Sequence, residues 1–335
     1  MKSYAEVVIV GGGIAGCTTA YYLAEKGLSD VILLEKSHLT SGATGQCAGG
    51  IRTQLSSDIK VRLAQGSRKI FSTLQEELQY ERDLELDENG YLSLVYSEEG
   101  VQDMTAVIAF QKERGVPVDL ISLKEAKKLF PDLCMDGVQA AVFHDQGGII
   151  NPHLTGVAFA EAARKRGVTI YTNTEVTGIK TKAGKVTGVV TDKGEISTPM
   201  VVNAAGLAFG KICAMAGINL PVNVEFMECW VTGVVDPIES PSLTLSWTYP
   251  FFVFTQRKTG NLVIMGNQLD FKGVPDNMRD LQSSRRVSDA ASYILRAFPW
   301  LKDVKIIRHW FGPIPTTTDN HPILGTVEEV EGFYL

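Results

Sequence analysis

Residues 7–35 constrain the fold of this chain more than any other stretch. They read VVIVGGGIAGCTTAYYLAEKGLSDVILLE. The apolar run Val7 to Val10 predicts a buried strand, and the segment 13–26 predicts a helix after a G-x-G-x-x-G spacing. A second apolar run, Val31 to Leu34, ends at Glu35. This order predicts a βαβ unit that binds a dinucleotide.

The three glycines and the acid each have a physical role in such a unit. Gly11 permits the tight turn, Gly13 lets the backbone approach a pyrophosphate, and Gly16 lets the helix pack against the strand. The helix N-terminus offers N–H groups and a positive dipole end to the phosphates. Glu35, about twenty residues further on, is placed to accept hydrogen bonds from ribose hydroxyls. The alternative, glycines that only ease packing, does not explain an acid at the strand end.

Composition sets limits on the class of protein. With 335 residues, a net charge of −6 and 44% hydrophobic residues, the chain is long enough for a large core and two domains. Mild acidity argues against a nucleic-acid surface. No apolar run reaches transmembrane length, and the first strand begins too early for a signal peptide. We therefore expect a cytoplasmic protein with five reduced thiols, which are Cys17, Cys47, Cys134, Cys213 and Cys229.

A glycine-rich segment, HLTSGATGQCAGGIRTQL, follows the second strand. Its composition predicts a loop, and its position predicts that it runs along the bound cofactor. A plain flexible loop is the alternative. Cys47 lies in it and is a candidate to approach the cofactor, whereas Cys17 in the first helix reads as a packing residue. Arg52 near its end is a candidate anion ligand, because a guanidinium fork suits a carboxylate.

Helices and strands alternate along the rest of the chain. Residues 57–79 predict a helix with one buried face, and residues 122–130 a short helix that a capping box begins. The run 195–203 predicts a single strand, so the chain returns to the nucleotide-binding fold there. Residues 219–269 predict an antiparallel sheet. The buried face of the helix over 57–79 is expected to hold Ile59, Leu63, Ile70 and Leu74. Further along the chain we expect a helix over 277–298, a strand over 304–311 and an irregular loop over 312–325.

Five stretches resemble one known family. They are VIVGGGIAG with Glu35, SGATGQCAGGIRTQL, RGVTIYTNTEVTGI, VVNAAG and RHWFGPIPTTTDNHPILG. The chain resembles the FAD-dependent amino-acid oxidoreductases of the D-amino-acid oxidase superfamily. Within it, the β-subunits of heteromeric sarcosine oxidase and dye-linked proline dehydrogenase are the most similar. The stretches span nearly the whole chain, so the resemblance is specific.

The resemblance implies an α/β fold with an α+β second domain. A Rossmann-like FAD-binding domain would comprise residues 1–85, 145–215 and 310–335, and an antiparallel-sheet substrate domain residues 86–144 and 216–309. It implies that Arg52 lies beside the flavin ring and acts in catalysis. The implied cofactor-binding residues are Gly11, Gly13, Ile14, Ala15, Gly16, Glu35, Lys36, Thr44, Gly45, Ala48, Gly49, Gly50, Ile51, Val176, Asn203, Ala204, Ala205 and Gly206.

Two departures from the family pattern matter. Glycine-oxidase-like members carry a carboxylate-binding arginine at the position of Ile314, which favours the heteromeric branch for this chain. The family also continues beyond Leu335 into a glycine-rich turn and a closing helix. We therefore expect the chain as given to bind FAD weakly or not at all, and to turn over poorly.

The resemblance implies oxidation of a small amino acid or secondary amine of the sarcosine, proline or glycine type. A hydride would pass to flavin N5 and the resulting imine would hydrolyse. Such chemistry needs orientation and desolvation rather than a triad or a metal, and the five histidines show no metal-binding spacing. Trp247 and Tyr249 are candidates for the substrate pocket. The implied partners are the substrate and another subunit, with FMN at the subunit interface in some members. One alternative is a non-catalytic FAD-binding subunit. Another is an enzyme that uses NAD as its nucleotide, which the long second loop and the VVNAAG stretch disfavour.

Overall fold

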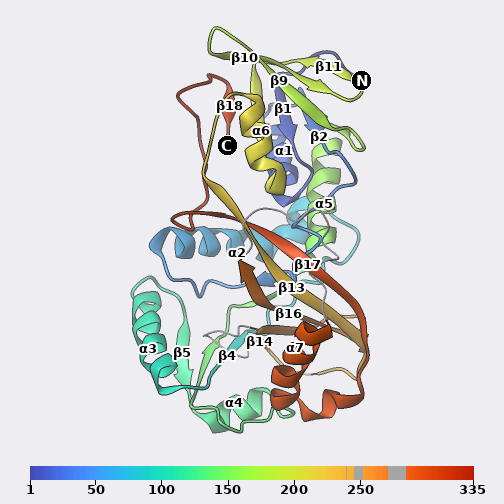
Figure 1. Ribbon diagram of the computed structural model, residues 1–335. Coiled ribbons are helices and arrows are strands. Elements are labelled where there is room, and N and C mark those ends of the chain that lie inside the picture. Colours follow the sequence, from blue (N-terminus) through green and yellow to red (C-terminus); the bar gives the residue numbers. More distant parts are fainter. Residues whose placement is uncertain (239, 245–251, 271–283) are drawn as a thin grey trace.

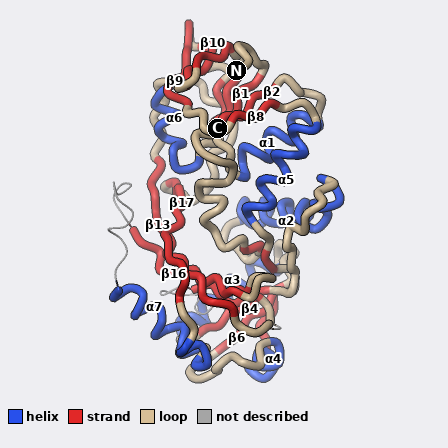
Figure 2. The backbone as a smooth tube through the Cα atoms, turned by 90° about the vertical axis from the view of Figure 1, so that its right-hand side faces the viewer, coloured by secondary structure: helices blue, strands red, loops and turns tan. Residues whose placement is uncertain are grey.

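The structure is a computed structural model that describes residues 1–238, 240–244, 252–270 and 284–335. It has two lobes (Figure 1). One lobe holds both termini and the βαβ unit, and the other is built around a large antiparallel sheet. Two long strands, β13 (Val222–Val234) and β17 (Ile306–Thr317), pair antiparallel and run from one lobe to the other (Figure 2).

A five-stranded parallel sheet forms the centre of the first lobe, in the order β18-β12-β1-β2-β8. Successive side chains of β1 point to opposite faces, as the strand period of two requires. Val7 and Ile9 pack in a core with α1 and α5, whereas Val8 and Val10 pack in a core with α6 and β9. The elements are β1 (Val7–Val10), α1 (Ile14–Glu25), β2 (Val31–Leu34), α5 (Pro152–Lys165), β8 (Thr169–Tyr171), β12 (Met200–Asn203), α6 (Phe209–Met215) and β18 (Phe333–Tyr334).

The single strand expected over 195–203 is wrong: the structure has two strands there. β11 (Gly194–Ser197) pairs antiparallel with β10 (Lys185–Thr191), which pairs in turn with β9 (Val176–Lys182). β12 pairs parallel with β1 in a different sheet. The break falls at Thr198-Pro199, and proline cannot donate a ladder hydrogen bond.

The second lobe contains an eight-stranded sheet in the order β17-β13-β16-β15-β14-β4-β6-β5. Phe130, Trp230, Phe254 and Phe298 lie in its main core. The remaining elements are β4 (Tyr91–Val95), α3 (Glu98–Lys112), β5 (Val118–Ile121), α4 (Leu123–Leu129), β6 (Ala140–His144), β14 (Ser242–Thr244), β15 (Phe252–Gln256), β16 (Asn261–Asp270) and α7 (Ser284–Ala297). The antiparallel sheet expected over 219–269 is present in the described residues, and the expected helix start at 277 lies outside them.

The irregular loop expected from Gly312 is also wrong in its first half. β17 continues through Pro313 and Pro315 to Thr317. β17 is the outermost strand of its sheet and has β13 on one side. Proline is tolerated in such an edge strand because its missing N–H faces away from the ladder. Only residues 318–325 are irregular.

The helix α2 (Asp58–Leu78) forms where expected, but its buried face differs. Ile59, Leu63 and Ile70 are 52%, 45% and 36% exposed, and of the four expected residues only Leu74 is buried. The helix packs into two different cores. Val61 near its start joins one core, and Leu74 and Leu78 near its end join another. The helix therefore buries different faces near its two ends, and not one continuous apolar face along its length.

Two helix starts follow their sequence signals. Ser122 and Glu125 form the expected capping box, and the side chain of Asn151 caps α5. Among the helices of the described ranges, none is long and apolar enough to cross a membrane. The expected boundary at 309/310 falls inside β17, and the domain division remains a proposal.

Candidate functional site

The three glycines of the G-x-G-x-x-G motif between β1 and α1 differ in their surroundings. Protein packing requires two of them to be glycine, and the third has little protein around it. Gly11 has φ +112°, and a Cβ there would lie 2.4 Å from the Ala204 carbonyl oxygen. A Cβ on Gly16 would lie 1.9 Å from the Gly11 oxygen. A Cβ on Gly13 would meet only the Thr44 hydroxyl, at 3.2 Å. Packing therefore explains Gly11 and Gly16, whereas Gly13 leaves room for a ligand at the helix start.

The N-terminus of α1 is suited to an anion. Gly13 is its N-cap residue and provides no side-chain cap, and the first turn carries no acidic residue. Thr44, from the flavin-side loop (residues 38–52), accepts a hydrogen bond of 3.0 Å from the Ile14 N–H. The helix therefore presents its positive dipole end beside this loop.

Glu35 is buried, with 8% of its surface exposed. Its Oε2 accepts a hydrogen bond of 2.8 Å from the Gly12 N–H, and its Oε1 accepts one of 2.8 Å from the Ser37 N–H. These bonds fix the carboxylate against the glycine turn. Each oxygen has a second lone pair, so Glu35 can also accept hydrogen bonds from ligand hydroxyls.

A small cavity of about 80 Å³ adjoins Glu35. It brings together residues that are far apart in the sequence: Gly11, Glu35 and Lys36 on one side, and Val176 and Ala205 on the other. β1, β2, β9 and the turn after β12 supply these residues. The glycine motif pointed to Gly11 and Glu35 and the family resemblance implied the other three, and the fold brings all five to one cavity.

A larger cavity of about 530 Å³ lies on the other side of the same turn. Ala15, Ala204 and Gly206 border it from the first lobe, and Ile314 borders it from β17. Its other lining residues are Lys60, Asn203, Phe209, Val222, Pro315, Thr316, Thr317, Asn320, His321, Pro322 and Ile323. The two cavities thus border the two ends of the Gly11–Ala15 turn, one beside Glu35 and the other beside β17.

The sequence did not single out Lys60 for this site. It is the one lysine or arginine among the described residues that line the larger cavity. On the linear sequence it is an ordinary polar residue of a surface helix, and only the packing of α2 beside the end of β17 brings it here. His321 lines the same cavity and makes a 3.1 Å contact from Nε2 to the Ser57 hydroxyl.

The flavin-side loop is ordered by contacts with both lobes. Gly50 and Ile51 form β3 (Gly50–Ile51), which pairs with β7 (Gly148–Ile149). Ala48 and Gly49 are buried immediately before it. The loop is therefore held to a second strand and is not a plain flexible segment.

Arg52 follows β3 directly and is partly exposed. It is not among the described residues that line the two cavities. Trp247 and Tyr249 lie outside the described residues. His309 on β17 contacts the buried Glu228 carboxylate, at 2.7 Å from its Nε2.

The residues present fit an FAD. Gly13 is an N-cap without a side-chain cap at the start of α1, Glu35 lines one cavity, and Ala15 lines a second. The fold and this site define a dinucleotide-binding protein of the α/β class, with an antiparallel sheet beside the nucleotide lobe. The chain belongs to the family of FAD-dependent oxidoreductases (DAO), whose pattern matches residues 6–335. It is an oxidoreductase, and FAD is its cofactor.

Known proteins resemble the chain over its whole length. The sarcosine oxidase subunit beta of Rhodobacter capsulatus is 27% identical over 100% of this chain and 80% of its own length. Human mitochondrial sarcosine dehydrogenase is 29% identical over 100% of this chain, which spans only 37% of that longer protein. The crystal structure of L-proline dehydrogenase from P. horikoshii superposes with a TM-score of 0.91, at 30% identity over 100% of this chain and 87% of that one.

Proposed function

We propose that this chain oxidises a small amino acid or secondary amine of the sarcosine, proline or glycine type to an imine, which water then hydrolyses. The observation that carries the proposal is the 530 Å³ cavity, which joins the cofactor turn at Ala204 to the mainly apolar wall around Ile314. A small substrate in that cavity would lie next to the nucleotide site. The names of the three similar proteins agree with this substrate class.

The residues of the chain would bind and orient rather than transfer protons. Bound FAD supplies the acceptor for the hydride that leaves the carbon next to the amine. Glu35 and the Gly13 turn would hold its ribose and pyrophosphate. Ile314, Pro315 and Ile323 would exclude water from the reacting groups. Arg52 is our candidate for the substrate carboxylate or a flavin oxygen.

A substrate screen of the purified protein tests the proposal. We expect the oxidised-flavin absorbance to bleach under anaerobic conditions with at least one of sarcosine, proline and glycine. Bleaching should depend on substrate concentration and should be absent with acetate, which has a carboxylate but no amine. A flavin spectrum that none of the amino acids changes would contradict the proposal.

The second candidate is a non-catalytic FAD-binding subunit of a heteromeric electron-transfer complex. The specific observation in its favour is Ile314, an apolar residue where the glycine-oxidase-like pattern has a carboxylate-binding arginine. The same screen separates the two candidates, because this subunit would hold flavin that no amino acid reduces.

We also propose that the active protein is hetero-oligomeric, which rests on the resemblance to subunits of heteromeric oxidases. Size-exclusion chromatography of the natively expressed protein should show a complex larger than the 36.5 kDa chain. A partner-free monomer with full activity would contradict it.

A further inference from the structure

The side chain of Arg257 joins the large sheet to the flavin-side loop. Arg257 directly follows β15, and its Nη2 donates a hydrogen bond to the Ala48 carbonyl. Its Nη1 donates one of 3.3 Å to the Ile150 carbonyl. The backbone of Arg257 is fixed as well, because its N–H donates to the Asn261 oxygen at 2.9 Å in the turn between β15 and β16. A rigid hairpin thus holds one guanidinium against two carbonyls.

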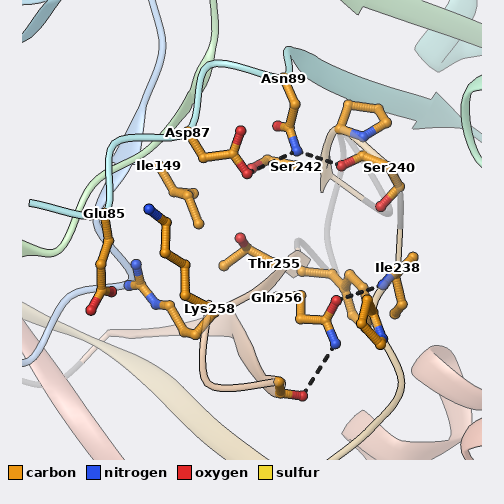
Figure 3. Close-up of a pocket in the computed structure, with 15 residues that line it drawn as sticks. Glu85, Asp87, Asn89, Ile149, Ile238, Ser240, Ser242, Thr255, Gln256 and Lys258 are labelled. Carbon is orange, nitrogen blue, oxygen red and sulfur yellow. Dashed lines mark hydrogen bonds between the residues drawn. The ribbon is translucent and has the colours of Figure 1, made fainter. Parts of the chain in front are cut away.

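This guanidinium forms part of the wall of a polar cavity of about 200 Å³ (Figure 3). Glu85, Asp87 and Asn89 line one side of the cavity, and Thr255 and Gln256 line the other. Burial lowers the pKa of Arg257 and the Glu85 carboxylate raises it. An arginine keeps its charge throughout the physiological range, so both of its hydrogen bonds to carbonyls are charge-assisted.

Three carbonyl groups of the loop around Ala48 have partners outside the loop. The Trp310 Nε1–H, from β17, donates to the Gln46 oxygen at 2.9 Å. The Ile150 N–H donates to the Gly49 oxygen at 2.9 Å. Three successive contacts, from Trp310, Arg257 and Ile150, therefore fix the backbone just before β3. The chain reaches Arg52 two residues after Gly50, with no flexible segment between.

We propose that Arg257 is a positioning residue that holds the flavin-side loop in its bound geometry and thereby orients Arg52. The part that concerns Arg52 rests on the function proposed above. A lysine at this position would keep the positive charge but has no planar fork, so it cannot donate to both carbonyls in the same way. Loss of the fork should let residues 46–50 open more often, with little effect on the rest of the fold.

The backbone amide of Ile150 reports on the opening of this loop. It donates to the Gly49 oxygen at 2.9 Å, so its hydrogen exchange with solvent requires that contact to break. Cys47 is already exposed, so alkylation of its thiol would not measure opening. The buried strand β1, which includes Val8, is the reference for global unfolding.

The experiment measures hydrogen–deuterium exchange in the FAD-loaded protein, resolved by peptide mass spectrometry. In Arg257→Lys we expect the peptide that contains Ile150 to exchange about tenfold faster, the factor that corresponds to losing one charge-assisted hydrogen bond, while the β1 peptide exchanges as in the wild type. The matched control is Lys258→Gln. It removes the neighbouring cation, which pairs with Asp83 at the surface, and should leave the Ile150 exchange rate unchanged.

A second readout is kinetic and uses the amino acid found in the screen. Arg257→Lys should lower kcat/KM about tenfold and Lys258→Gln should not. If Arg257→Lys does not fold, Arg257→Met keeps the apolar stem and takes its place. An unchanged Ile150 exchange rate in a folded variant would overturn the proposal. The exchange result needs no substrate, so it remains decisive even if the screen shows that the proposed function is wrong.

Discussion

The buried carboxylate of Glu35 accepts a hydrogen bond of 2.8 Å from the Gly12 N–H, so the acid at the end of β2 holds the glycine turn at the end of β1. The two residues are 23 positions apart in the sequence. This bond couples the acid that we propose to bind the ribose to the turn that would face the pyrophosphate. Removing the carboxylate should therefore affect both parts of the nucleotide site.

We expect Glu35→Ala to weaken FAD binding by about 1.5–3 kcal/mol, the contribution of a hydrogen bond to a charged group. Fluorescence titration of apoprotein with FAD measures the change. Glu25→Ala, at the exposed far end of α1, is the matched control and should bind as the wild type does. Equal FAD affinity in the wild type and Glu35→Ala would rule out a ribose-binding role.

Gly13→Ala separates a ligand-binding glycine from a packing glycine. The added Cβ meets only the Thr44 hydroxyl at 3.2 Å, so the free energy of unfolding should change by less than about 1 kcal/mol. FAD affinity should fall, because the methyl group occupies space beside the helix start. Gly11→Ala should instead lower the melting temperature of the apoprotein, since its Cβ would lie 2.4 Å from the Ala204 oxygen. Unaltered FAD binding in Gly13→Ala would show that the turn faces no pyrophosphate.

Arg52→Lys should lower kcat/KM for the amino-acid substrate by about ten- to a hundredfold, because lysine lacks the bidentate fork. Stopped-flow measurement of anaerobic flavin reduction gives the rate and the apparent affinity separately. Arg62→Lys, on the exposed side of α2, should leave both unchanged. A rate and an affinity like those of the wild type in Arg52→Lys would remove Arg52 from the site.

His144 should make stability depend on pH. It is fully buried, its Nδ1 accepts from the Gln146 N–H at 3.2 Å, and its Nε2 lies 2.6 Å from the Thr53 hydroxyl. This pattern requires the neutral ring, and burial lowers the pKa of His144 below 6.5. The unfolded chain therefore binds the proton more readily. The stability that His144 contributes is complete above pH 6.5 and is lost as the pH falls through the lowered pKa.

Urea unfolding at pH 7.5 and at pH 5.5 measures this dependence, with the two pH values chosen about one unit either side of the ordinary histidine pKa. The loss of stability on acidification should be smaller in His144→Gln than in the wild type. All other residues are the same in the two proteins, so the comparison isolates His144. An identical loss in both would contradict the assignment.

The sequence alone determined the βαβ unit, because its parts are local. β1, α1 and β2 form within the first 34 residues, and the glycine spacing and the terminal acid follow from steric limits and hydrogen bonding within that segment. Caps such as Ser122 with Glu125, and Asn151, were equally predictable, since each acts within one turn of its own helix. The family resemblance then extended these local signals to the class of enzyme.

Only the tertiary structure decided which distant residues meet. The face that α2 buries depends on two cores, one at each end, which no periodicity within the helix encodes. The course of β17 through Pro313 depends on its place at the edge of the sheet. Lys60 reaches the large cavity, and Arg257 reaches Ala48 across 209 positions, because packing of separate elements brings them together. No local sequence pattern predicts such contacts, because the packing energy that favours them arises only when distant elements come together in the folded protein.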